Sequence, residues 1–279
     1  MDDQQFHQLL DRFELSRSGY RKVRKGVIKR IGRHMLEIGC RDISAYLSVI
    51  ADNVEAKDQC RQLLTVSISR FFRDRQLWQD LEQKIFPELI QNENKSLRIW
   101  SAGCACGEEV YTIKIIWDRM QKGRIPQPLL HITATDLNPL YLEKAQAGLY
   151  SSSSLRDVPD SLRSIYFTPV KGARGYGVQS FLKENIIWQT TDIFSGVPGS
   201  GYHVIFLRNN LLTYYREHLQ KNAFINILDS LANNGFLIIG AHESLPVQTP
   251  LLAPFGSCWY VFRKVIPLPS MEMKLPSLF

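Results

Sequence analysis

The chain has 279 residues, 44% of them hydrophobic, which is enough for a substantial core and one or two domains. It lacks an apolar run of the roughly eighteen residues that a membrane-spanning helix needs, and it begins with a polar segment unlike a signal peptide. We therefore expect a cytoplasmic protein that does not insert into a membrane.

The cysteines indicate reduced thiols. They are odd in number and widely scattered, which disfavours a disulfide framework: Cys40, Cys60, Cys104, Cys106 and Cys258. Cys104 and Cys106 form a lone C-x-C motif, without a second pair of Cys or His ligands at the spacing of a zinc site. The sequence therefore predicts no metal site.

Much of the net charge of +7 lies near the start of the chain. Between residues 12 and 33, Glu14 is the single acidic residue among nine basic ones: Arg12, Arg17, Arg21, Lys22, Arg24, Lys25, Lys29, Arg30 and Arg33. Such a surface can attract an acidic partner, such as nucleic acid or an acidic helix, or can simply be the solvated face of a helical domain. No DNA-binding motif accompanies it, and we expect no nucleic-acid partner.

The first part of the chain has a helical pattern. Apolar residues recur at three- and four-residue spacing in 43–51 and 58–64, with Asp42 and Ser44 as N-cap candidates. A longer amphipathic helix is expected over 71–89, broken at Pro87, and a polar linker over 91–96 follows. This pattern predicts a helical domain over 1–88 and a second domain over 89–279.

The second domain alternates strands with helices. Strands are expected at 97–101, 131–135, 186–189, 204–207 and 236–240, and helices at 110–120, 140–147 and 218–231. This alternation predicts an α/β fold with a doubly wound, Rossmann-like parallel sheet, which binds ligands at the carboxyl ends of its strands. A turn-rich insert between residues 151 and 183 is read as a small subdomain.

A glycine turn follows the first expected strand. Gly103 and Gly107 permit a sharp turn and a close approach to a ligand. The turn matches neither G-x-G-x-x-G nor a Walker loop, and Glu108 and Glu109 would repel a pyrophosphate. These two acids suit an ammonium or sulfonium group, or they complement the helix dipole.

Asp136 ends the next expected strand. An ionised carboxylate there can accept two hydrogen bonds from the vicinal diol of a ribose, although Asp136 could instead cap the following helix. The glycine turn and this acid together favour a ribose-bearing ligand without phosphate, and S-adenosylmethionine fits that description.

Further polar residues are expected at the same rim. Asp192 could face the adenine amine, Arg208, Asn209 and Tyr214 follow another strand, and Arg73 could bind a carboxylate. Each also has an ordinary interpretation as an edge asparagine, a packed tyrosine or a surface residue.

Six segments, in this order, resemble the CheR family of chemotaxis-receptor methyltransferases: SISRFFRD, IWSAGCACGEEVYTI, ATDLNPLYLEKAQAGLY, SSSSLRDVPDSLRSIYF, FLRNNLLTYY and GFLIIGAHESL. The resemblance implies a helical N-terminal domain, a class I methyltransferase domain and an inserted β-subdomain near 151–185. It also implies that this subdomain or the basic N-terminal domain docks on the cytoplasmic helices of a chemoreceptor-like protein.

The resemblance also implies site residues. The positions that match the family's S-adenosylmethionine site are Ser67, Ser69, Arg73, Gly103, Asp136, Asp192, Ile193, Arg208 and Asn209, together with either Glu108 or Glu109 as the cofactor acid. Arg73 is expected to orient a carboxylate, of the acceptor or of the cofactor, and Tyr214 to line the face on which the methyl group is transferred.

The chain departs from the family at four places. Ser67 and Ser69 replace Asn and Thr, and Cys104 and Cys106 fall where the family usually has Ser or Thr. Leu207 replaces the usual Cys, and an extra residue separates the Arg-Asn pair from the tyrosine. We expect these changes to affect the identity of the acceptor and the rate of methyl transfer more than the binding of the cofactor.

The expected reaction is transfer of a methyl group to a protein glutamate, with S-adenosylhomocysteine as the second product. A carboxylate of pKa about 4.3 is ionised at neutral pH, so no general base is needed. Two alternatives stay open: a methyltransferase of this fold with another protein or small carboxylate as acceptor, and a non-enzymatic S-adenosylmethionine-binding signalling module. Hydrolysis by His242, Glu243 and Ser244 is disfavoured because no G-x-S-x-G elbow is present. We expect a monomer.

Overall fold

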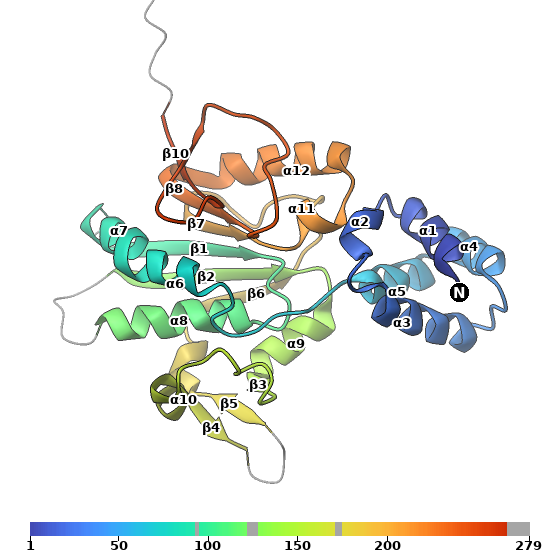
Figure 1. Ribbon diagram of the computed structural model, residues 1–279, viewed down its shortest axis with the longest axis horizontal. Helices are drawn as coiled ribbons and strands as arrows, with labels where there is room; N and C mark the ends of the chain where they lie inside the picture. The colour runs from blue at the N-terminus through green and yellow to red at the C-terminus, as the bar shows by residue number, and fades with distance from the viewer. Residues whose placement is uncertain (93–94, 122–127, 171–174, 267–279) are drawn as a thin grey trace, which may run out of the picture.

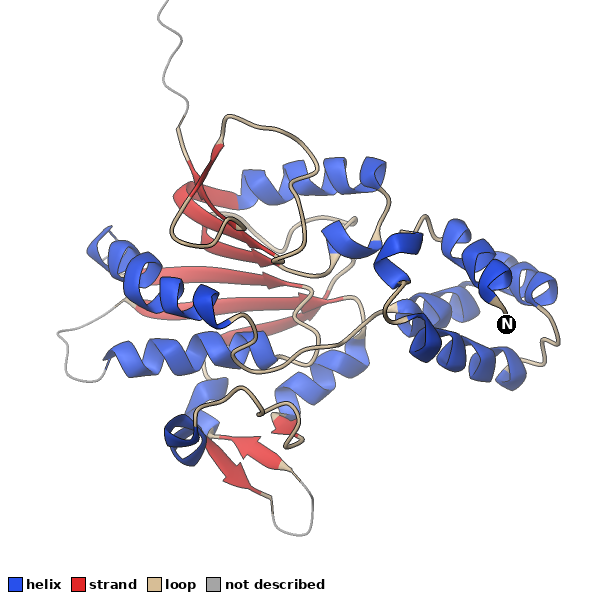
Figure 2. Cartoon of the chain, viewed as in Figure 1, coloured by secondary structure: helices blue, strands red, loops and turns tan. Residues whose placement is uncertain are grey.

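The computed structural model describes residues 1–92, 95–121, 128–170 and 175–266 (Figures 1 and 2). The chain begins with a bundle of short helices: α1 (Asp3–Arg12), α2 (Arg17–Tyr20), α3 (Arg24–Glu37), α4 (Ile43–Asp52) and α5 (Val54–Leu64). Asp2 and Gln5 form a capping box on α1, and Asp42 caps α4 as expected. The bundle has its own core, which includes Phe6, Ile31 and Tyr46.

The next helical stretch belongs to the other core. It consists of α6 (Arg75–Asp80), the π-helical η1 (Leu81–Ile85) and α7 (Phe86–Asn92). Phe71, Trp78 and Phe86 pack with the sheet, whereas the N-terminal core ends at Leu64. The predicted boundary at residue 88 is therefore wrong in terms of packing, because the helical segment over 71–89 buries its apolar face against the sheet.

The predicted break at Pro87 is also wrong. The Phe86 N–H bonds to the carbonyl of Leu81, five residues back, just before the proline. Such a π-turn opens the backbone where the ring of Pro87 would otherwise crowd the preceding turn, and the helix continues to Asn92.

The second domain is built on a seven-stranded sheet of order β6-β2-β1-β7-β8-β10-β9. Strands are drawn in red in Figure 2. Its strands are β1 (Ser96–Ala102), β2 (Leu129–Asp136), β6 (Ile186–Thr190), β7 (Tyr202–Leu207), β8 (Leu231–Ile239), β9 (Leu252–Pro254) and β10 (Val261–Lys264). The pairs from β6 to β8 are parallel, and β10 is antiparallel to both neighbours. The predicted doubly wound sheet is confirmed. Strand order reverses at β1, and this creates a crevice at the carboxyl ends of β1 and β7.

Helices connect the strands: α8 (Glu108–Gln121), α9 (Pro139–Ala147), α11 (Leu211–Tyr214) and α12 (Glu217–Ser230). α8 and α9 contact β2, whereas α12 contacts β8. The N-terminal bundle lies beyond the carboxyl ends of β1 and β2 (Figure 1). No helix in the described ranges has both the length and the apolar character needed to cross a membrane.

A second, three-stranded antiparallel sheet forms the inserted subdomain, with the order β3-β5-β4. The subdomain comprises β3 (Leu149–Tyr150), α10 (Asp160–Tyr166), β4 (Phe167–Pro169), β5 (Tyr176–Val178) and the 3-10 helix η2 (Ser180–Lys183). The insert lies where it was predicted and begins two residues earlier. The ring of Phe71 contacts those of Tyr150 and Phe167 edge-on, which fastens the subdomain to the segment that joins the two domains.

Candidate functional site

Two adjoining cavities lie at the carboxyl ends of the parallel strands. The larger, which we call the adenosine cavity, has a volume of about 330 Å³ and is lined by the ends of β2, β6 and β7 and by the N-terminal bundle. The smaller, which we call the amino-acid cavity, has a volume of about 50 Å³ and is lined in part by Ser69, Arg73 and Glu109. Val66, Gly103 and Asn209 line both, so these residues mark the junction.

The glycine turn is bonded to the end of β2. The N–H groups of Gly103 and Cys104 both donate to the carbonyl of Thr135, at 2.8 and 2.9 Å. Gly103 has φ +81°, and a Cβ placed on it would lie 2.1 Å from the side-chain nitrogen of Asn210. Glycine is therefore required here both for the backbone conformation and for the close approach of the neighbouring loop.

Asp136 lines the adenosine cavity and is buried. One carboxylate oxygen accepts from Ala105 N–H and the other from Asn138 N–H, each at 2.9 Å. Burial raises the pKa of Asp136, although these backbone hydrogen bonds offset part of the rise. A carboxylate oxygen has more than one lone pair, so Asp136 retains acceptor capacity for the two hydroxyls of a ribose.

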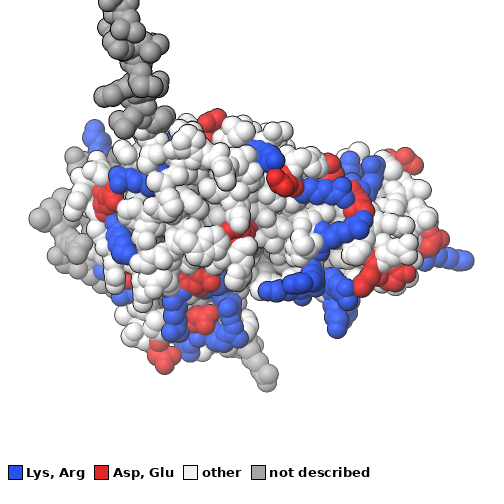
Figure 3. Space-filling model, turned by 45° about the horizontal axis from the view of Figure 1, so that its top comes forward, with Lys and Arg blue, Asp and Glu red and all other residues white. Residues whose placement is uncertain are grey.

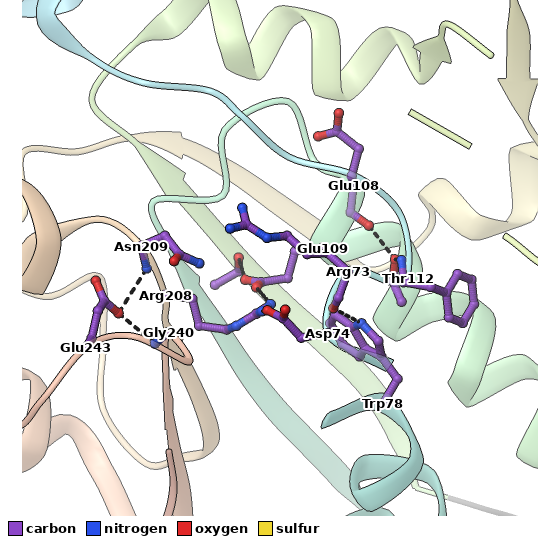
Figure 4. Close-up of polar contacts among 12 residues, drawn as sticks. Arg73, Asp74, Trp78, Glu108, Glu109, Thr112, Arg208, Asn209, Gly240 and Glu243 are labelled. Carbon is purple, nitrogen blue, oxygen red and sulfur yellow. Dashed lines mark hydrogen bonds and ion pairs between the residues drawn. The ribbon is translucent and has the colours of Figure 1, made fainter. Parts of the chain in front are cut away.

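The two glutamates at the start of α8 have different surroundings (Figure 4). Glu109 lines the amino-acid cavity, accepts from Ser101 Oγ at 2.8 Å and pairs with Arg208 at 2.8 Å. Glu108 lines neither cavity, and its buried Oε2 has no hydrogen-bond partner among the described residues. Figure 4 shows its side chain pointing away from Glu109 and Arg208. Of the two candidate cofactor acids, the structure brings Glu109 to the site.

We expect Glu108→Gln to raise the melting temperature at pH 7, by about 2–4 °C for each kcal/mol gained. Burial raises the pKa of Glu108 in the folded protein, so its contribution to stability is full below the unfolded pKa and is lost as the pH rises through the folded pKa. Glutamine does not ionise and so avoids this loss of stability. At pH 4, where the glutamate is largely protonated in both states, the variant should have no higher melting temperature than the native protein. Glu109→Gln, which breaks an ion pair, should instead lower the melting temperature. Thermal unfolding of both variants at the two pH values measures this, and equal shifts would contradict it.

Arg208 organises the wall of the amino-acid cavity. It is buried, pairs with both Asp74 and Glu109, and lies 5.6 Å over the ring of Trp78. Two carboxylates around one guanidinium leave a net negative charge, which suits the ammonium group of an amino acid. Arg208 thus contributes to the site through the two acids that it holds.

Arg73 lies in a strained loop beside this wall. Phe72 and Asp74, on either side of it, have φ of +53° and +64°, and non-glycine residues adopt this conformation at a cost. The Arg73 guanidinium donates to the carbonyl of Ile68 at 3.0 Å and lines the amino-acid cavity, where it can pair with a carboxylate. The neighbouring Ser69 lines the same cavity, whereas Ser67 lines neither.

The loop after β7 is held by a buried carboxylate that the sequence analysis did not place in the site. Glu243 Oε2 accepts from the N–H groups of Asn209 at 3.0 Å and Gly240 at 2.6 Å (Figure 4). Its Oε1 accepts from Thr213 Oγ1 at 2.5 Å. Asn209 has φ +52°, so this contact stabilises a strained residue at the junction of the two cavities.

Glu243→Ala should therefore slow methyl transfer and destabilise the fold by about 1–3 kcal/mol, because it leaves buried N–H groups without an acceptor. Glu243→Gln keeps one acceptor oxygen, so its rate of methyl transfer and its free energy of unfolding should lie between those of Glu243→Ala and the native protein. Steady-state kinetics and urea unfolding measure the two effects. Loss of stability with an unchanged kcat would show that Glu243 supports the fold alone.

The remaining candidates surround the adenosine cavity. Asp192 and Ile193 follow β6, and Tyr214 ends α11; all three line the cavity, as does Asn209. The ring of Tyr214 lies 5.1 Å from that of Tyr20, and burial raises its pKa.

The polar lining residues that were not predicted include Arg61, Asn210 and Tyr215. Asn210 and Tyr215 adjoin predicted residues in the FLRNNLLTYY segment. Arg61 offered no local signal, because its partner Asp192 is 131 residues away.

These surroundings fit S-adenosylmethionine. Asp136 has lone pairs for a ribose, and Gly103 admits a close backbone approach at the junction. The paired acids and Arg73 complement an ammonium and a carboxylate in the amino-acid cavity.

Comparisons with known proteins agree with this arrangement. Residues 67–261 match the CheR methyltransferase family, S-adenosylmethionine-binding domain. The chemotaxis protein methyltransferase of Listeria innocua is 30% identical over 188 residues, covering 67% of this chain and 69% of that protein. Chemotaxis protein methyltransferase 1 of Pseudomonas aeruginosa is 29% identical over 187 residues, covering 65% of this chain and 68% of that protein.

A third relative is much longer. A 104.1 kDa uncharacterized protein of Rhodobacter capsulatus is 28% identical over 223 residues, and the match covers 78% of this chain but 23% of that protein. The family match spans more than half of the present chain, and it includes the residues at the strand ends that line the two cavities. The chain therefore belongs to the CheR methyltransferase family, with a class I methyltransferase fold and S-adenosylmethionine as its cofactor.

Proposed function

We propose that the protein methylates glutamate side chains on the cytoplasmic helices of a chemoreceptor-like protein, in chemotaxis adaptation. S-adenosylmethionine supplies an electrophilic methyl group on a sulfonium. A glutamate carboxylate oxygen forms a bond to that methyl carbon as the carbon–sulfur bond breaks, and the electron pair stays on sulfur. The products are a glutamate methyl ester and S-adenosylhomocysteine, and no proton is released.

The lining of the two cavities supports a carboxylate acceptor. The described lining residues include no histidine or lysine. Their carboxylates are engaged already: Glu14 with His218, Glu109 with Arg208, Asp192 with Arg61, and Asp136 with backbone N–H groups. A site without an available base suits an acceptor that is ionised at neutral pH, as glutamate is. The site's task is then to align the two reactants, which can contribute about 7–11 kcal/mol.

Arg73 and Tyr214 are the side chains that we assign to the two sides of the junction: Arg73 lines the amino-acid cavity and Tyr214 the adenosine cavity. Arg73 is anchored to a carbonyl of its own loop. Burial raises the pKa of Tyr214, and the positive charge of Arg73 offsets part of that rise. Arg73 would orient a carboxylate, and Tyr214 would help to exclude water from the reacting oxygen.

The function is tested by methyl transfer from radiolabelled S-adenosylmethionine to membranes that contain chemoreceptors, followed by mild alkali. Release of labelled methanol would show a carboxyl methyl ester. Transfer to a different acceptor would select another substrate for the same fold. No transfer by protein that binds S-adenosylhomocysteine in calorimetry would favour the non-enzymatic signalling module.

The basic surface of α3 is the docking face that we propose for an acidic receptor helix. Lys25, Lys29 and Arg33 are four residues apart, exposed, and form no ion pair with any described residue. Like charges at this spacing disfavour a helix, so the stripe is better explained by a partner than by stability. Figure 3 shows basic side chains gathered over this domain. Arg30, in contrast, donates to the carbonyls of Leu63 and Thr65 and has a structural role.

Reversing two of these charges, Lys25→Glu with Lys29→Glu, should raise the KM for receptor membranes about tenfold at low salt, with less effect at high salt. The affinity for S-adenosylhomocysteine should not change. Lys57→Glu with Lys95→Glu, at exposed lysines on α5 and just before β1, is the matched control. An equal effect of both pairs on the KM would reject α3 as the docking face.

A further inference from the structure

An ion pair joins the two domains across the adenosine cavity. Arg61, near the end of α5, donates to Asp192 Oδ2. Both residues line the cavity, with side chains 30% and 20% exposed. Burial alone lowers the pKa of Arg61, but the hydrogen bond and charge of Asp192 raise it overall, so the guanidinium remains charged. The pair is thus a partly desolvated contact between charged groups in the wall of the cofactor site.

The Asp192 carboxylate is held from two sides. Oδ2 accepts from Arg61, and Oδ1 accepts from the N–H of Phe194 at 3.1 Å. These contacts fix the plane of the carboxylate, and each oxygen keeps a lone pair for another donor. Without Arg61 the side chain could rotate toward solvent, because the remaining bond is to its own loop.

Asp192 lies at the end of the strand next to the one that carries Asp136. Asp136 pairs in register with Thr190 on the neighbouring strand β6, and Asp192 follows two residues later. Adjacent strands are about 4.8 Å apart. The end of β6 is therefore within reach of the base of a nucleoside whose ribose binds Asp136, and Asp192 is the acidic lining residue there.

The N-terminal bundle also contacts the ribose side of the cavity. The Asn138 side chain donates to the carbonyl of Gln62 at 3.3 Å and to Thr65 Oγ1 at 3.2 Å. The Asn138 N–H in turn holds Asp136. The end of α5 therefore contacts the loops after both β2 and β6, the two loops expected to flank an adenosine.

We propose that Arg61 is a positioning residue for cofactor selection: it holds Asp192 to accept a hydrogen bond from the 6-amino group of adenine. The N-terminal domain thereby supplies part of the specificity for adenine. Hypoxanthine carries a carbonyl oxygen at this position, and a fixed carboxylate opposite that oxygen is repulsive. This inference concerns the cofactor alone and is independent of which acceptor is methylated.

Calorimetric titration of the full chain with S-adenosylhomocysteine and with its deaminated analogue, S-inosylhomocysteine, tests the proposal. The native protein should prefer the adenine form at least about 100-fold. Arg61→Met should reduce that preference about tenfold, and Arg61→Lys should restore part of it, since lysine keeps the charge but not the guanidinium geometry. Arg41→Met, at an exposed arginine of the same domain, is the control and should leave both affinities unchanged.

Asp192→Asn provides a second, independent variant. Its amide can donate to the hypoxanthine oxygen, so the preference for adenine should fall further than in Arg61→Met. Thermal unfolding without ligand establishes that each variant is folded. An equal loss of affinity for both ligands in Arg61→Met would overturn the proposal and show that Arg61 only stabilises the contact between the two domains. An unchanged preference in Asp192→Asn would also overturn it.

Discussion

Replacement of Gly103 by alanine will abolish detectable binding of S-adenosylhomocysteine and lower the free energy of unfolding by about 1–3 kcal/mol. Gly103 has φ +81° at the junction of the two cavities, and its N–H is bonded to the end of β2. A Cβ would lie 2.1 Å from Asn210 Nδ2 and 2.7 Å from its Cγ, so the loop after β7 must move. That loop carries Asn209, which lines both cavities. Calorimetry and urea unfolding measure the two effects.

Gly32→Ala is the matched control for this substitution. Gly32 lies inside α3, and a Cβ added there meets nothing within 4 Å. Alanine in a helix interior is favoured over glycine, so this variant should be more stable by about 0.5–1 kcal/mol with unchanged ligand affinity. Normal binding by Gly103→Ala would show that the cofactor does not approach the turn closely.

Asp136→Ala will weaken binding of S-adenosylhomocysteine about 10²–10⁴-fold. Two hydrogen bonds from ribose hydroxyls to a charged acceptor contribute about 1.5–3 kcal/mol each, and the variant loses both. Asp136→Asn, which is neutral but retains one oxygen, should have an intermediate affinity. Asp229→Asn, at an exposed aspartate of α12, is the control. Native affinity in Asp136→Ala would place the ribose elsewhere.

The affinity for S-adenosylhomocysteine should also depend on pH through Asp136. Burial raises the pKa of this carboxyl, and the ribose hydroxyls bind its ionised form. Affinity is therefore full above the raised pKa and falls as the pH is lowered through it, with uptake of a proton by the free protein. Titrations from pH 8 down to the lowest pH at which the protein stays folded measure the decline. Asp136→Asn cannot titrate at this position and should lack the dependence.

Much of the architecture could be predicted from local patterns. Apolar runs separated by amphipathic helices indicate buried parallel strands, because a strand covered on both faces must be apolar throughout. The glycine turn and Asp136 follow their strands directly, so their place at the carboxyl edge of the sheet could be expected as well. Gly103, Asp136, Asp192 and Asn209 all line the adenosine cavity.

The errors arise where local patterns are ambiguous. An amphipathic helix over 71–89 has the same periodicity whichever core it covers, so the pattern could not show that Trp78 and Phe86 pack with the sheet. Likewise, Glu108 and Glu109 are consecutive on α8 and project in directions about 100° apart. Either could have faced the cofactor, and the packing of α8 turns Glu109 toward the amino-acid cavity.

The sequence by itself thus determined the doubly wound class, the cofactor type and the acidic and glycine residues at the strand ends, because these depend on neighbours along the chain. Only the tertiary structure decided which acid faces the site, that Glu243 holds Asn209, and that Arg61 reaches Asp192 from another domain. Charge pairs and buried hydrogen bonds between distant segments are set by how the two cores dock, and their energies depend on burial that no local pattern records.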